Sequence, residues 1–113
     1  MNKQKFNLFL DKLLEKTEQE QIKWEKTADR ATFLAVFKDN AIALSRILDN
    51  TMFDILQFAF RNEVGDIVDI VSLSNFDGEH EEFKKAEKIY NLAKNQPDQI
   101  DQTLDQIIEQ LAA

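Results

Sequence analysis

The sequence predicts an α+β fold: an N-terminal helix, an antiparallel meander sheet of four to five strands, and two C-terminal helices packed on the sheet. Two observations predict this class. Apolar residues recur every three or four positions near both ends of the chain, which is typical of amphipathic helices. Over residues 22–73 they recur mostly at every second position, which is typical of strands joined by short turns. Since the 113 residues contain no linker or repeat, we expect a single domain over residues 1–113.

The first helix is predicted from a one-sided apolar pattern that ends near residues 17–21. Its apolar face consists of Phe6, Phe9, Leu10, Leu13 and Leu14. Apolar and charged residues then alternate around Trp24, so we expect a short strand with this side chain facing the core.

The central strands are predicted at Thr32–Lys38, Met52–Arg61 and Ile67–Leu73, with Gly65 in the last turn. Segment Ala41–Leu48 fits either a strand or a helix, and we favour a strand because its neighbours have a two-residue period.

Two of these strands are apolar on both faces, which helices on one side of the sheet cannot cover. Thr32–Lys38 alternates Phe33 and Phe37 with Leu34 and Val36, and Met52–Arg61 has a similar pattern. Exposing large apolar side chains costs roughly 1.5–3 kcal/mol each. Either the helices cover both faces, or a second chain covers one of them in a homodimer or with an obligate partner.

The C-terminal segment returns to a helical period. Asp77 is a suitable N-cap for one helix, and Pro97 suits the first position of another. The first helix has an inward face of Phe83, Ala86, Ile89, Tyr90 and Ala93, and the second has an apolar stripe of Ile100, Leu104, Ile107, Ile108 and Leu111.

Several short runs occur in a recognisable order. Leu13–Thr17 has the pattern LLxxT and precedes the strand with Trp24, while Phe58–Ile67 forms a hairpin with a glycine turn. The runs Tyr90–Ala93 and Asp101–Ile108 follow. This order resembles a family of small uncharacterised bacterial α+β proteins. The resemblance implies the fold and no activity.

The composition argues against most enzyme chemistry and against nucleic-acid binding. The chain has no cysteine, one histidine and two glycines, so the usual nucleophiles, proton shuttles and phosphate loops are scarce. Its net charge is −7, with +2 over residues 1–46 and −9 over residues 47–113, and phosphate backbones repel such a chain. No apolar run approaches the roughly 18 residues of a membrane span. Because the N-terminus does not read as a signal peptide, we expect a cytoplasmic protein.

We interpret the candidate metal-binding and catalytic residues as ordinary surface residues. His80 lies among acidic residues, but their spacing matches no metal motif, so we expect a solvated helix start and no metal or cofactor. Carboxylates are abundant, yet no spacing indicates two that converge in a cavity. We therefore expect no catalytic residues, and an enzyme with a carboxylate-only site is a third hypothesis.

One acidic stripe follows the last helix and is a candidate docking face for a partner with a basic surface. It consists of Asp98, Asp101, Asp105 and Glu109. No Lys or Arg follows Lys94, so no neighbour on the helix neutralises the stripe. The alternative is a face that serves solubility only.

From these observations we expect a small non-enzymatic protein-binding or regulatory module that acts through its sheet or its acidic helix. The leading alternative is an acidic inhibitor or immunity-type protein that blocks a basic site on an enzyme.

Overall fold

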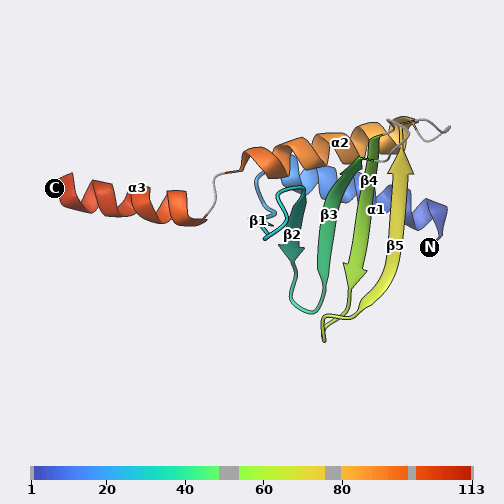
Figure 1. Ribbon diagram of the computed structural model, residues 1–113, viewed down its shortest axis with the longest axis horizontal. Helices are drawn as coiled ribbons and strands as arrows, with labels where there is room; N and C mark the ends of the chain where they lie inside the picture. The colour runs from blue at the N-terminus through green and yellow to red at the C-terminus, as the bar shows by residue number, and fades with distance from the viewer. Residues whose placement is uncertain (1, 49–53, 76–79, 97–98, 113) are drawn as a thin grey trace.

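The elements of the fold follow the predicted order in the computed structural model, which describes residues 2–48, 54–75, 80–96 and 99–112. In chain order they are α1 (Lys3–Glu18), β1 (Trp24–Lys26), β2 (Thr32–Val36), β3 (Ala41–Leu48), β4 (Asp54–Arg61), β5 (Ile67–Ser74), α2 (His80–Asn95) and α3 (Gln99–Ala112) (Figure 1). The sheet has the order β1-β2-β3-β4-β5, and each neighbouring pair is antiparallel. The α+β class and the meander are therefore confirmed. The expected cap Asp77, the helix start at Pro97 and the beginning of the strand predicted from Met52 lie outside the described residues.

Helix α1 begins and ends with local hydrogen bonds that its sequence supplies. The Asn2 Oδ1 atom accepts from the backbone N–H groups of Gln4 at 2.8 Å and Lys5 at 3.3 Å, which caps the first turn. At the other end Glu20 has a left-handed backbone with φ of 59°, and the N–H of Gln21 donates to the carbonyl of Lys16 at 2.9 Å. This is a helix-ending turn that turns the chain towards β1.

Segment Ala41–Leu48, which fitted a strand or a helix, forms strand β3. It pairs with β4 from Ala41↔Arg61 to Leu48↔Asp54, and with β2 from Ala41↔Val36 to Ser45↔Thr32. These ladders satisfy its backbone groups on both sides, and this tertiary pairing overrides its ambiguous local propensity.

The core lies between the sheet and a layer formed by α1 and α2. These two helices pack side by side and cover the same face of the sheet, called here the inner face (Figure 1). Its strand residues are buried, and they are Trp24, Phe33, Ala35, Ile42, Leu44, Leu56, Phe58 and Leu73. The Lys85 Nζ atom also contacts Asp11 Oδ1 at 2.7 Å, which joins the two helices at the surface.

Phe58 lies at the centre of this core and is fully buried. Its ring contacts those of Phe6 and Phe9 from α1 in edge-on geometry, with centroids 5.9 Å and 5.5 Å apart. Such aromatic pairs add specific contact energy to the burial of apolar surface. The expected inward position of Trp24 is confirmed.

The C-terminal end of α2 is tied to the free edge of the sheet. The Gln96 Oε1 atom accepts from the backbone N–H of Trp24, and its Nε2 atom donates to the carbonyl of Ile22, both at 2.9 Å. The indole Nε1 of Trp24 donates to Thr17 Oγ1 at 3.2 Å inside the core. These bonds occupy backbone groups of an edge strand that would otherwise be open to pairing.

A polar cluster joins β3, β4 and α2 at the rim of the core. The Arg46 guanidinium donates to both carboxylate oxygens of Asp54, at 2.9 Å and 2.7 Å, and to Glu87 Oε2 at 2.6 Å. It also lies 5.4 Å from the centre of the Tyr90 ring. The hydrogen bonds to Asp54 raise the pKa of Arg46 above its ordinary value, so the cation is held in this position.

Of the two C-terminal helices, α2 packs on the sheet as expected, whereas α3 does not. Helix α3 extends away from the sheet in Figure 1, and its side chains are exposed wherever the structure describes them. The physical reason is that α1 and α2, with 16 residues each, already fill the inner face.

Phe58 provides a stability test of the core. We expect Phe58→Ala to lower the free energy of unfolding by about 3–5 kcal/mol, because it leaves a cavity among the rings of α1 and β4. The matched control is Phe37→Ala at a ring that is 40% exposed, for which we expect a loss below about 1 kcal/mol. Urea denaturation measures both, and equal losses in the two variants would contradict the described core.

Tyr90 provides a test of the rim, because it is the only tyrosine in the chain. Burial raises the pKa of Tyr90 above its ordinary value of 10.0, and its hydroxyl donates to the carbonyl of Ala31 at 3.3 Å. The folded state thus favours the neutral phenol, so this contribution to stability is complete below about pH 10 and is lost as the pH rises through the folded pKa. We expect the tyrosinate absorbance to appear at higher pH in the native protein than in the urea-unfolded chain, and Tyr90→Phe to remove the transition. Equal midpoints in the two states would show that the ring is solvated.

Candidate protein-docking surfaces

The face of the sheet opposite the helices is largely apolar and is called here the outer face. Side chains alternate along each strand, so the residues between the buried ones point to this side. Its apolar members on β2 to β5 are Leu34, Val36, Ala41, Ala43, Ile47, Ile55, Ala59, Ile67 and Ile70. The cross-strand partners Leu34↔Ala43, Ala43↔Ala59 and Ala59↔Ile70 form one continuous row across four strands.

The larger side chains of the outer face are open to solvent. Val36 is 59% exposed, Ile70 49% and Ile47 38%, while Leu34 and Ile55 are half-buried by their neighbours. Figure 1 shows no helix over this side of the strands in the described part of the chain. A contiguous apolar surface of this kind is typical of an interaction site.

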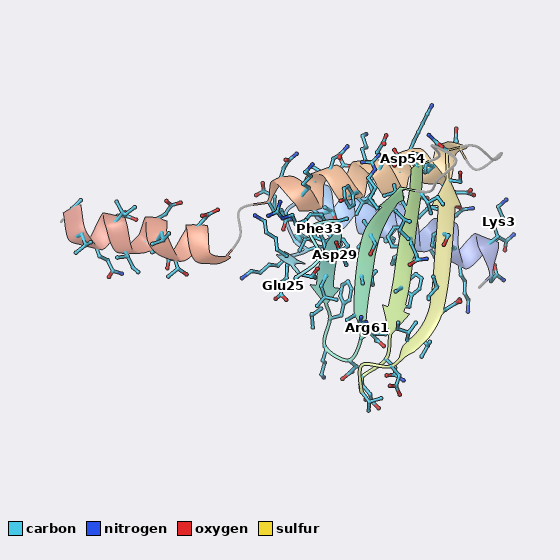
Figure 2. The ribbon with its side chains drawn as sticks, in the orientation of Figure 1. Lys3, Glu25, Asp29, Phe33, Asp54 and Arg61 are labelled. Atoms are coloured by element: carbon cyan, nitrogen blue, oxygen red, sulfur yellow. The ribbon has the colours of Figure 1, made fainter. Side chains whose placement is uncertain are left out.

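The polar side chains of the outer face are mostly uncharged and bonded to one another. The hydroxyls of Thr32 and Ser45 are 2.8 Å apart, and Gln57 Nε2 donates to Ser72 Oγ at 3.2 Å. On β2 to β5 the charged residue of this face is Arg61, which is exposed at the end of β4 (Figure 2). The outer face can therefore be covered with little desolvation of charge.

The second exposed apolar surface is a stripe along α3. Leu104, Ile107, Ile108 and Leu111 are 49%, 45%, 61% and 80% exposed. They lie at three- and four-residue spacing and so share one side of the helix. These four residues are called the α3 stripe. The side chain of Ile100, which the sequence placed in the same stripe, lies outside the described part.

The predicted acidic docking face also lies on α3. The side chains of Asp101, Asp105 and Glu109 are exposed and follow one another at four-residue spacing, while Asp98 lies outside the described residues. This acidic stripe runs beside the α3 stripe, so the helix offers an apolar surface with an acidic border.

The structure brings two carboxylates together, but in a structural role. Asp54 and Glu87 converge on Arg46, which binds both of them. A depression of about 480 Å³ lies between the ends of α1 and α2, and its polar lining residues are Thr17, Glu18, Glu20, Lys23, Asn95 and Gln96. The side chains of Thr17 and Gln96 form the hydrogen bonds that hold β1, and Glu18 and Glu20 are exposed at the rim of the depression. The side chains of Asp54, Glu87, Thr17 and Gln96 therefore hold elements of the fold together.

Metal ligands do not gather in the part of the chain that the structure describes: it contains no group of three or more His, Cys, Asp or Glu side chains placed to hold an ion. The side chain of His80, which opens α2, lies outside the description.

The sequence already indicated that the outer face is apolar, because two predicted strands were apolar on both sides. It contained no signal for the exposure of the α3 stripe, since a buried and an exposed amphipathic helix share the same period. None of the helices described is long and apolar enough to cross a membrane.

Comparison with known proteins gives no information on function, so the proposals below are argued from the docking surfaces. No protein family, curated protein or solved structure matches this chain. The resemblance to small bacterial α+β proteins stays a prediction.

Proposed function

We propose that this chain is a small, non-enzymatic protein-binding module of the cytoplasm that holds an apolar segment of another protein on its outer face. The observation that carries the proposal is the row Leu34–Ala43–Ala59–Ile70, which is apolar across four strands on a side that the helices leave open.

The physical support is that such a face gains stability when it is covered. Burial of each large aliphatic side chain contributes about 1.5–3 kcal/mol, and the outer face offers several of them with few charges to desolvate. The small side chains of Ala43 and Ala59 lie in the middle of the face, so a partner can approach the sheet closely there. A regular, rigid sheet also loses little conformational entropy on binding.

A second candidate function uses the acidic stripe of α3. Asp105 and Glu109 are exposed, and no Lys or Arg follows Lys94 to neutralise them. Such a surface suits an inhibitor or immunity-type protein that blocks a basic site on a partner enzyme.

The outer face is tested by Ile70→Glu on the edge strand β5. The matched control is Val64→Glu, which makes the same change at a residue that is 74% exposed in the turn Asn62–Asp66. In pull-downs from the native host with mass-spectrometric identification, we expect Ile70→Glu to lose its partner by at least about tenfold and Val64→Glu to retain it. Both variants should unfold within roughly 0.5 kcal/mol of the parent chain. Capture that survives both substitutions would refute binding through this face.

The acidic stripe is tested by the triple substitution Asp101→Asn, Asp105→Asn and Glu109→Gln. If the stripe docks a basic partner, association should slow and lose its salt dependence, because exposed charges mainly steer the encounter. The control neutralises three exposed acids at the turns of the sheet, Asp39, Glu63 and Asp66. Stopped-flow or surface-binding kinetics measure the association rate. Equal association rates for the triple variant and the parent at low salt would show that the stripe serves solubility only.

A further inference from the structure

We infer that the α3 stripe and the outer face are the two halves of one interface, formed between two copies of this chain, with α3 of each copy lying on the outer face of the other. The inference rests on the proposed function, because it names what occupies the outer face when no other protein is bound there.

The two surfaces match in size. Helix α3 has 14 residues and is therefore about 21 Å long. Strands β3 and β4 have eight residues each and run for about 26 Å, and the outer face from β2 to β5 is about 14 Å wide. A helix is roughly 10–12 Å across with its side chains, so α3 fits along these strands.

The charges at the rim of the outer face are mixed. The acidic stripe borders the α3 stripe on one side, and α3 has no Lys or Arg. Arg61 projects from the outer face and forms no ion pair among the residues that the structure describes, and Lys38 is exposed in the neighbouring turn. When the α3 stripe faces the sheet, its acidic border lies at the rim, where Arg61 and Lys38 supply opposite charge beside the exposed acids of the same turns, so apolar contact dominates the interface.

The chain is too short for α3 to occupy its own outer face along the strands. Gln96 is held at the free edge of β1 by its hydrogen bonds to Trp24 and Ile22, and α3 begins at Gln99. Three Cα–Cα steps span at most about 11 Å. The middle of the outer face, between β3 and β4, is about 12 Å from β1 across the sheet alone, before the thickness of a helix is added. The partner that can offer α3 to this face is a second copy.

A reciprocal arrangement makes the same contact twice. In a two-fold dimer each α3 covers the partner's outer face, so the buried area is doubled towards the roughly 1,200–2,000 Å² of stable interfaces. It also removes from water, in one step, both apolar surfaces that each copy leaves exposed.

The test is the oligomeric state of the full chain, measured by sedimentation equilibrium over micromolar to submillimolar concentrations. We expect a dimer that persists at high salt, because apolar contact dominates it. The double substitution Ile107→Asp and Ile108→Asp on α3 should weaken the dimer by at least about 100-fold, and Ile70→Glu on the sheet should do the same. The matched controls are Gln106→Glu on the polar side of α3 and Val64→Glu in the turn, which should leave the dimer intact.

Mixing the two damaged chains separates this arrangement from other dimers. The double variant keeps an intact outer face, and the Ile70→Glu variant keeps an intact α3, so each alone should be monomeric while the mixture pairs through one contact. Val36→Glu, on the opposite side of the outer face, should replace Ile70→Glu in this experiment with the same result.

Several results would overturn the inference. These are a parent chain that is monomeric throughout, a dimer that survives both sets of substitutions, or a mixture that does not pair. Loss of self-association would leave the proposed function standing if partner capture still depended on Ile70. Conversely, a dimer with these properties in a chain that captures no other protein would refute the proposed function alone.

Discussion

The structure depends on one constraint: both long helices bury their apolar sides on the same face of the sheet. Phe58 contacts Phe6 and Phe9 of α1, while Phe33 contacts Tyr90 of α2 with ring centroids 5.3 Å apart. With this layer complete, the inner face has no room for a third helix. The exposed outer face and the exposed α3 are therefore two consequences of a single packing choice.

The polar contacts at the edges of the core secure this choice. Arg46 joins β3 and β4 to α2 through Asp54 and Glu87, and Gln96 ties the end of α2 to β1. A partly buried ion pair of this kind adds little net stability, because desolvation offsets its attraction. Its value lies in geometry, since Glu87 of α2 binds the same guanidinium as Asp54 of the sheet.

Function follows from what this packing leaves unsatisfied. Polar groups at the rim of the core are engaged in the fold: Asp54 and Glu87 bind Arg46, and Thr17 accepts a hydrogen bond from Trp24. The unsatisfied surfaces are apolar, on the sheet and on α3, and apolar surface in water is relieved by association with another chain. This is why the proposals concern binding, and why one chain can supply both halves of an interface.

The sequence by itself determined the order of the elements, because helix and strand periods and the Gly65 turn are local properties. It also showed that a strand predicted at Thr32–Lys38, of which Thr32–Val36 forms β2, is apolar on both faces. It located the acidic stripe of Asp98, Asp101, Asp105 and Glu109. Only the tertiary structure decided that Ala41–Leu48 is a strand, that α1 and α2 share one face, and that α3 stands away from the sheet. The physical reason is that a period describes the two sides of an element but not what covers them. That depends on contacts between residues far apart in the chain, such as Gln96 with Trp24, which no local pattern encodes.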